Sequence, residues 1–269
     1  MIQTITLIGA GRVGSALAIH LHACDIRVAQ VYSRTPERAR TVADRVGARA
    51  VHELEKLHAT GDCFLLAVPD DAIAQTATRL ASILPAQTLL AHTSGATPIN
   101  AIPTHFRAGI FYPLQSFAKR REVDWNTLPL CVHATSERDL HLLEKLAARL
   151  APNVHRIDDE QRAALHVAAV FVNNFTNHLY GIGEELTQKE GVPFELLFPL
   201  IREGVDRLGS APARQLQTGP AMRGDQQTQA RHLQFLKRYP SYQKIYRLHS
   251  AAIHIQAIRH DPPDPEEKG

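Results

Sequence analysis

Residues 1–35 read MIQTITLIGAGRVGSALAIHLHACDIRVAQVYSRT. The apolar run at residues 5–8 ends at a glycine-rich turn, a helical stretch follows, and a second apolar run covers residues 26–32. Strand, turn, helix and strand in this order form the context in which a GxGxxG motif indicates a dinucleotide-binding site. We therefore expect the chain to begin with a nucleotide-binding unit.

The glycine motif reads Gly9-Ala10-Gly11-Arg12-Val13-Gly14. Gly9 is expected to make the tight turn, Gly11 to let the backbone approach a pyrophosphate, and Gly14 to let helix and strand pack closely. Arg12 and Val13 open the helix, whose free N–H groups favour a phosphate. Such a turn can also be purely structural, but the complete unit favours dinucleotide binding.

The end of the second strand indicates which dinucleotide binds. NAD sites usually carry an acidic residue about 20 positions after the glycines, which binds the ribose 2′-OH. This chain has Ser33, Arg34 and Thr35 there, with no acidic residue before Glu37. A guanidinium and two hydroxyls suit a 2′-phosphate, so the sequence predicts NADP(H). The alternative is that Arg34 lies in solvent while Ser33 and Thr35 cap the next helix.

Composition limits the remaining possibilities. The 269 residues are 44% hydrophobic and 21% charged, as expected for a soluble globular protein. A net charge of +3, with Lys119-Arg120-Arg121 interpreted as a solvated loop, argues against a nucleic-acid partner. Cys24, Cys63 and Cys131 are far apart and match no metal-site spacing, and the N-terminus resembles no signal peptide. We expect a cytoplasmic protein with no metal and no membrane partner.

Strand and helix patterns alternate up to residue 157, which predicts a Rossmann-type, doubly wound and mostly parallel α/β sheet. Ligands of such sheets bind at the carboxyl ends of the strands. Three strand ends are therefore grouped: Val68-Pro69-Asp70-Asp71, His92-Thr93-Ser94-Gly95 and Phe111-Tyr112-Pro113-Leu114. Val68 and Pro69 are assigned to the cofactor site.

Residues 158–260 show helical periodicity alone and predict an all-α second domain, and residues 261–269 are expected to be a disordered tail. One long helix is expected to include residues 163–183, which contain no charged side chain but are too polar to span a membrane. Its polar side carries His166, Asn173, Asn177 and Tyr180. This side is expected to face a ligand cleft or a partner subunit; the alternative is that these side chains satisfy one another within a helical core.

Two residues of the turn-rich stretch before residue 226 stand out. Asp225 is placed to cap the helix that begins at Gln226. Arg223 lies between Gly219-Pro220 and Gly224, and a fixed arginine beside a cleft suits a carboxylate or a phosphate. Because the uncharged helix has to be covered, we also expect a homodimer built from the helices after residue 157.

Taken in order, these motifs resemble a bacterial family that pairs a Rossmann-like NADP-binding domain with a C-terminal domain of unknown function. More distantly, the chain resembles pyrroline-5-carboxylate reductase, prephenate dehydrogenase, and the 3-hydroxyisobutyrate and 6-phosphogluconate dehydrogenases. This resemblance implies a 6-phosphogluconate-dehydrogenase-like helical domain that supplies substrate contacts and often the dimer. The β-hydroxyacid dehydrogenases carry a catalytic Lys shortly before paired asparagines. Here Asn173 and Asn174 are present, but residues 169–172 are Ala, Val, Phe and Val.

The predicted chemistry is hydride transfer between NADP(H) and a C=O or C=N of a small, carboxylate-bearing metabolite. His166 is the first candidate for handling the proton and His92 the second. Asn173, Tyr180, Asn177 and Ser94 are expected to orient the substrate, and Arg223 to hold its acid group. The missing lysine keeps a second hypothesis open, in which the protein binds NADP(H) as a regulator or scaffold without catalysis.

Overall fold

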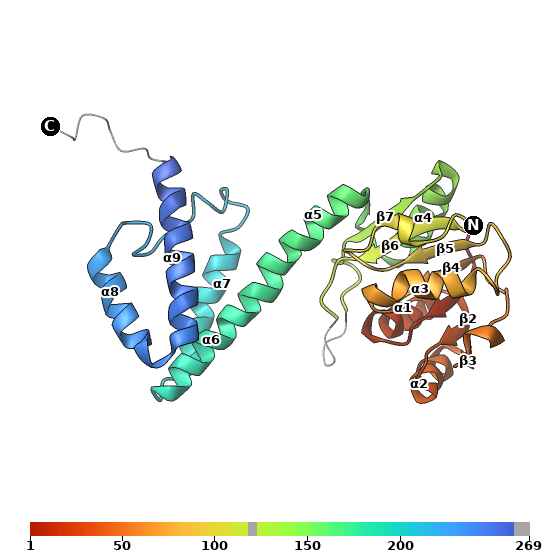
Figure 1. The fold of residues 1–269 in the computed structure, drawn as a ribbon, viewed down its shortest axis with the longest axis horizontal. Helices are drawn as coiled ribbons and strands as arrows, with labels where there is room; N and C mark the ends of the chain where they lie inside the picture. Colours follow the sequence, from red (N-terminus) through yellow and green to blue (C-terminus); the bar gives the residue numbers. More distant parts are fainter. Residues whose placement is uncertain (118–122, 261–269) are drawn as a thin grey trace. The chain divides into compact units, whose positions relative to one another are not determined.

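The computed structural model describes residues 1–117 and 123–260, and eight of its strands form one sheet in the order β3-β2-β1-β4-β5-β6-β7-β8 (Figure 1). The strands are β1 (Thr4–Ile8), β2 (Arg27–Tyr32), β3 (Arg49–Val51), β4 (Cys63–Leu66), β5 (Leu89–His92), β6 (Arg107–Pro113), β7 (Leu130–Ala134) and β8 (Val154–Arg156). All neighbouring pairs are parallel except β6 and β7. The predicted doubly wound, mostly parallel α/β fold is confirmed.

In the described residues up to 172, five α-helices accompany this sheet. They are α1 (Arg12–Ala23), α2 (Pro36–Val46), α3 (Asp70–Leu80), α4 (Glu137–Leu150) and α5 (Asp159–Ala169), with short 3₁₀ turns η1 (Leu54–Lys56) and η2 (Ile99–Ala101). Local sequence explains α2 well, because Pro36 opens its first turn and Gly47, at φ 63°, ends it in the left-handed region.

The two faces of the sheet are covered by different helices. One apolar cluster joins Leu17 and Leu21 of α1 and Leu143 of α4 to Leu7 and Val31. The other joins helix α3 to the opposite face through a set of buried side chains. These are Ile73, Ala77 and Leu80 of α3 with Ile8, Phe64, Leu66 and Leu90 of the strands. The strands are therefore enclosed on both sides, and ligand access is left to their ends.

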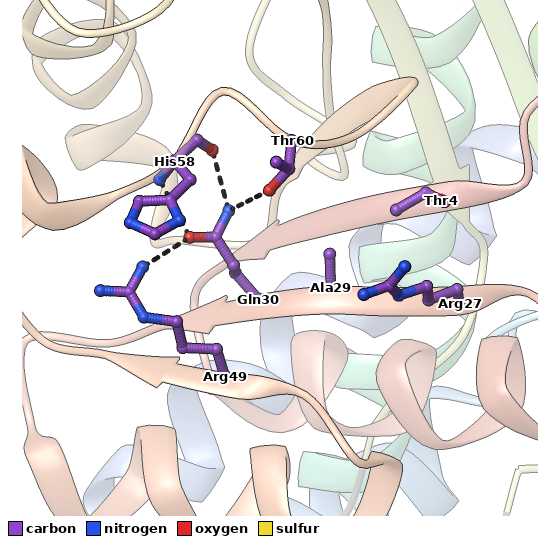
Figure 2. A pocket seen from close by; sticks show the side chains of 7 residues that line it. All are labelled: Thr4, Arg27, Ala29, Gln30, Arg49, His58 and Thr60. Atoms are coloured by element: carbon purple, nitrogen blue, oxygen red, sulfur yellow. Dashed lines mark hydrogen bonds between the residues drawn. The ribbon is translucent and has the colours of Figure 1, made fainter.

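Polar contacts of Gln30, on β2, connect this strand to β3 and to the loop before β4 (Figure 2). Gln30 is 2% exposed, and its amide nitrogen donates to the carbonyl of His58 (2.8 Å) and the hydroxyl of Thr60 (3.2 Å). Its amide oxygen accepts from the His58 N–H (3.0 Å) and from Arg49 (3.2 Å). These residues, together with Arg27, line a cavity of about 280 Å³. A buried amide satisfied at both ends holds the loop before β4 in place.

The chain divides into two compact units, Met1–Val172 and Asn173–Gly269. The sheet ends with β8 next to the expected boundary at residue 157, and the first unit continues through α5. The second unit contains α6 (Thr176–Lys189), η4 (Phe194–Leu197), α7 (Phe198–Asp206), α8 (Gln226–Phe235), η5 (Leu236–Arg238) and α9 (Pro240–His260). The predicted helical character of this region and the Asp225 cap, which accepts from the Thr228 N–H at 2.9 Å, are confirmed.

One prediction about the long uncharged helix is wrong. A π-helical turn, Val170–Phe175, separates α5 from α6, so the helix does not keep one α-helical period. A π turn inserts an extra residue and rotates the side chains that follow it. The polar face predicted from a uniform period therefore does not continue unchanged through Asn173.

Two segments predicted from the sequence, the basic loop 119–121 and the tail 261–269, lie outside the described residues. Within the residues described, no helix combines the length and the apolar character needed to cross a membrane.

Candidate functional site

The glycine turn between β1 and α1 has the geometry of a nucleotide-binding loop. Gly9 has φ +120°, and a Cβ atom there would lie 2.4 Å from the Ala67 carbonyl oxygen. A Cβ atom at Gly14 would lie 1.9 Å from the Gly9 carbonyl oxygen, whereas one at Gly11 would have no neighbour within 4 Å. Gly9 and Gly14 are thus required by packing, and Gly11 faces open space.

The start of α1 is suited to an anion. No side chain caps the helix at Gly11, and its first turn contains no acidic residue. The Arg12 side chain is exposed, while Val13 packs against the core. Uncapped N–H groups, the helix dipole and the open space at Gly11 together fit a pyrophosphate.

The segment after β2 leaves its polar side chains accessible. Arg34 is exposed, and its guanidinium forms no hydrogen bond or ion pair with the described residues. Thr35 is the N-cap residue of α2, but its side chain makes no capping bond. The Ser33 hydroxyl accepts from the Thr35 N–H at 3.2 Å. This arrangement does not support side-chain capping of α2 by Thr35 and leaves Arg34 free for a phosphate.

The strand ends next to the glycine turn differ in exposure. After β4, Val68 is half-buried and Pro69 is exposed. At the end of β5, His92 is fully buried, and its Nδ1 accepts from the Ser94 N–H at 3.2 Å. Burial, with the positive charge of Arg162, lowers the pKa of His92 to about 4. His92 is therefore neutral near pH 7.

Ser94 organises its own turn. Its hydroxyl donates to the Thr97 hydroxyl (3.0 Å) and accepts from the N–H groups of Ala96 (3.1 Å) and Thr97 (2.9 Å). These bonds commit the Ser94 side chain to the loop after β5 and fix the backbone at Gly95.

A tyrosine and a histidine meet over Gly95. The Tyr112 hydroxyl, at the end of β6, lies 3.3 Å from His166 Nδ1 on α5, and the donor depends on the histidine tautomer. A Cβ atom at Gly95 would lie 2.5 Å from that nitrogen and 2.9 Å from the tyrosine oxygen. Burial raises the pKa of Tyr112 to about 12, so the phenol keeps its proton. His166 itself is half-buried.

Helix α5 is fastened to the loop that follows β5. Asp159 accepts from the Ile99 N–H at 2.8 Å, and Arg162, 1% exposed, donates to the Thr97 carbonyl. The carboxyl ends of β1, β4, β5 and β6 point the same way because these strands are parallel. The Tyr112–His166 pair therefore lies on the sheet edge that also carries the glycine turn.

Two family models match the chain. One is described as NADP oxidoreductase, coenzyme F420-dependent, and covers residues 4–95; the other is a domain of unknown function, DUF2520, and covers residues 128–253. A Bacteroides fragilis protein assigned as an NADP oxidoreductase is 36% identical, with 94% of this chain and 98% of the other covered and a TM-score of 0.86. The chain belongs to this NADP oxidoreductase family. The predicted family pairing and the predicted NADP(H) cofactor are thereby confirmed.

More distant structures share the fold of this family. A pyrroline-5-carboxylate reductase from Coxiella burnetii is 14% identical, covering 95% of this chain and 97% of the other with a TM-score of 0.56. A Mycobacterium tuberculosis 3-hydroxyisobutyrate dehydrogenase is 16% identical, covering 82% and 77% with a TM-score of 0.57. No protein of curated function matches the chain.

The remaining predicted site residues of this family member belong to the second unit. Asn173 lies in the π-helical turn and Asn177 and Tyr180 lie on α6, and all three side chains are exposed. Arg223 is exposed on the turn between Gly219 and Gly224, both of which have positive φ angles. Among the residues that the structure describes, none of these four side chains has a hydrogen-bond or ion-pair partner.

The structure places three of the predicted site residues, His166, His92 and Ser94, around one loop. Three further residues of this site, Tyr112, Gly95 and Arg162, were not predicted from the sequence. The strand end at residues 111–114 was a usable signal for Tyr112, because it was grouped with the other carboxyl ends. Gly95 belongs to another of the grouped strand ends, residues 92–95, but the sequence did not indicate its role or that of Arg162, since both depend on where α5 packs.

Proposed function

We propose that the protein is an NADP(H)-dependent reductase or dehydrogenase that acts on a C=O or C=N of a small, carboxylate-bearing metabolite. The observation that carries the proposal is the Tyr112–His166 pair on the sheet edge that also bears the glycine turn. A nucleotide loop and a positioned side chain that can transfer a proton, at the same edge of the sheet, are the two parts that such chemistry requires.

The residues fit the cofactor in detail. Gly11 and the start of α1 would hold the pyrophosphate. Ser33, Arg34 and Thr35 would hold the 2′-phosphate, and Val68 and Pro69 would border the nucleotide. NADP(H), when bound, supplies or accepts the hydride. The protein itself has to orient the substrate, exclude water from the site and transfer the one proton that accompanies the hydride.

His166 handles the proton in this proposal. Histidine is the side chain used most often for general acid–base catalysis, and the Tyr112 phenol, which keeps its proton, orients the ring through Nδ1. His92 is neutral and buried, so its part is to hold the loop backbone through Ser94. In the second unit, the substrate-contact roles of Arg223, Asn173, Asn177 and Tyr180 stay predictions from the sequence.

A screen for NADPH oxidation tests the proposal. The unmodified protein is mixed with NADPH and a panel of small 2-oxo acids and cyclic imino acids, and absorbance at the nicotinamide band is followed. At least one member of the panel should be reduced at a rate above that of the same mixture without protein. No turnover with any member, by a protein that binds NADPH, would favour the second candidate.

The second candidate function is NADP(H)-dependent regulation without catalysis. Its support is the absence of lysine at residues 169–172, ahead of Asn173 and Asn174. Those positions lie at the end of α5 and in the π-helical turn. The two candidates differ in one measurement, because a regulator binds NADPH without oxidising it in the presence of any substrate.

Arg34 determines the choice of cofactor in both candidates. We expect NADP(H) to bind at least about tenfold more tightly than NAD(H), or ~1.4 kcal/mol, because an exposed guanidinium pairs with the 2′-phosphate. Arg34→Asp should remove the difference. Calorimetric titration with both nucleotides measures it, and Arg45→Asp, at the far end of α2, is the control for charge. Equal affinities in the unmodified protein contradict the assignment.

We also propose that the protein is a homodimer that acts in the cytoplasm. Among the described residues of the second unit, the hydrophobic side chains that are buried are Ala221 and Leu236 alone. Several large ones are exposed instead: Leu196 68%, Leu200 65%, Leu248 71%, Ile255 51%. Exposed apolar surface on this scale indicates an interface. The free cysteines Cys24, Cys63 and Cys131 suit a reducing compartment.

Light scattering at micromolar concentration should give twice the chain mass of 29.8 kDa. Leu248→Asp should shift the population towards the monomer, because a buried carboxylate in an apolar interface is costly. Lys244→Asp, on the same helix and also exposed, is the control. A monomeric mass for the unmodified protein counts against the dimer.

A further inference from the structure

Helix α5 and the loop after β5 make a regular series of contacts. Asp159, Arg162 and His166 are spaced three and four residues apart and so share one face of the helix. Their partners are the Ile99 N–H, the Thr97 carbonyl and the space over Gly95. Three contacts from one face of the helix therefore tie α5 to residues 95–99 of the loop.

Arg162 is the middle member of this series and the most buried one. Its side chain is 1% exposed, and its Nη1 lies 2.8 Å from an oxygen of Asp159. Removing a guanidinium from water is costly even when it is paired, so a buried ion pair is a poor way to gain stability. Among the described residues, Arg162 Nε and Nη1 and the facing Asp159 oxygen have no hydrogen-bond partner. The directed contact is the bond from Nη2 to the Thr97 carbonyl, and it fixes where this side chain meets the loop.

The loop side of the contact is rigid as well. The Ser94 hydroxyl binds the N–H groups of Ala96 and Thr97, and the buried His92 ring accepts from the Ser94 N–H. The Thr97 carbonyl that receives Arg162 therefore lies in a loop that is also held by its own hydrogen bonds. His166 lies one turn further along α5, and Gly95 leaves the space that its ring occupies.

We propose that Arg162 is a positioning residue, which with Asp159 sets the His166 imidazole against the Tyr112 hydroxyl. The proposal deepens the proposed function and rests on it for the role of His166. Arg162 does not touch the reacting atoms. Its effect passes through the helix backbone, since a shift of α5 along the loop moves His166 away from the gap over Gly95.

The test compares two arginines on the same protein. Arg162→Met removes the contact with Thr97, and the double variant Asp159→Asn/Arg162→Met removes both charges so that no carboxylate is left without its cation. The control is Arg107→Met. Arg107 pairs with the buried Asp139 at 3.5 Å and begins the strand that ends near Tyr112, so it lies at the opposite edge of the sheet.

The first readout needs no turnover. Nuclear Overhauser contacts between the His166 and Tyr112 rings, measured on full-length protein labelled at His and Tyr, should be present in the unmodified protein and in Arg107→Met. They should be lost in both Arg162 variants. If these contacts persist when Arg162 is gone, the positioning role is overturned, whatever the activity proves to be.

The second readout is kinetic. With a substrate identified by the NADPH screen, kcat of the Arg162 variants should fall about 100-fold, within the range expected for misplacing a proton-transfer group. The KM for NADPH should stay within about twofold. A matching loss in Arg107→Met would assign the effect to general destabilisation and reject the proposal. Loss of the ring contacts with unchanged kcat would instead reject His166 as the proton-transfer residue.

Discussion

Gly11→Ala should abolish most of the affinity for NADPH and leave the fold intact. A Cβ atom at Gly11 has no neighbour within 4 Å, and the backbone there, at φ −77°, is open to any residue. Replacing glycine at a compatible position reduces the entropy of the unfolded chain, so the melting temperature should be unchanged or slightly raised. The added methyl group fills the space through which a pyrophosphate approaches. We expect a loss of about 100-fold, or ~2.7 kcal/mol.

Gly14→Ala is the matched control, because it makes the same chemical change three residues later. Helix propensity favours alanine there by about 1 kcal/mol. The Cβ atom, however, would lie 1.9 Å from the Gly9 carbonyl oxygen, and backbone cannot yield as a flexible side chain does. We expect a large drop in melting temperature and poor expression. Thermal unfolding and calorimetric titration separate the two variants, and unaltered NADPH binding by Gly11→Ala refutes the nucleotide loop.

Local signals account for the parts of the fold that the sequence predicted well. Helix α2 follows from local sequence, because Pro36 opens its first turn and Gly47 ends it in the left-handed region. The Asp225 cap follows from the same kind of reasoning. The glycine turn is also local, since its neighbours lie within one strand, turn and helix unit.

Non-local packing explains what the sequence did not predict. The π-helical turn at Val170–Phe175 has no proline or glycine to mark it. The polar residues before Arg162 in α5 suggest that its side chain lies in solvent, but the loop after β5 buries it. Gly95 follows a strand as many turn glycines do, and only the approach of His166 shows why a side chain is excluded. His92, by contrast, was predicted as a site residue because it ends a strand, but at that position its side chain is completely buried.

His166→Ala should abolish turnover while leaving NADPH binding nearly unchanged. A positioned general acid or base contributes about 10²- to 10⁴-fold to the rate, so kcat should fall by that factor. In the proposed function, Gly11, Ser33 and Arg34 hold the adenosine half of the cofactor, and His166→Ala touches none of these positions. Steady-state kinetics with a substrate from the screen and a parallel NADPH titration measure the two effects. Retention of full kcat would remove His166 from the proposed mechanism.

Gly95→Ala separates the presence of the imidazole from its placement. The variant keeps both rings, but its Cβ atom would lie 2.5 Å from His166 Nδ1 and 2.8 Å from the Tyr112 ring. Tyr112 is 8% exposed and enclosed by its strand, so the half-buried His166 is the group that gives way. We expect kcat of Gly95→Ala to fall nearly as far as that of His166→Ala. The kcat of Tyr112→Phe should fall less, because the phenylalanine ring still fills the place of the tyrosine ring beside His166. If Gly95→Ala keeps full kcat, catalysis does not need His166 in the place where the structure shows it.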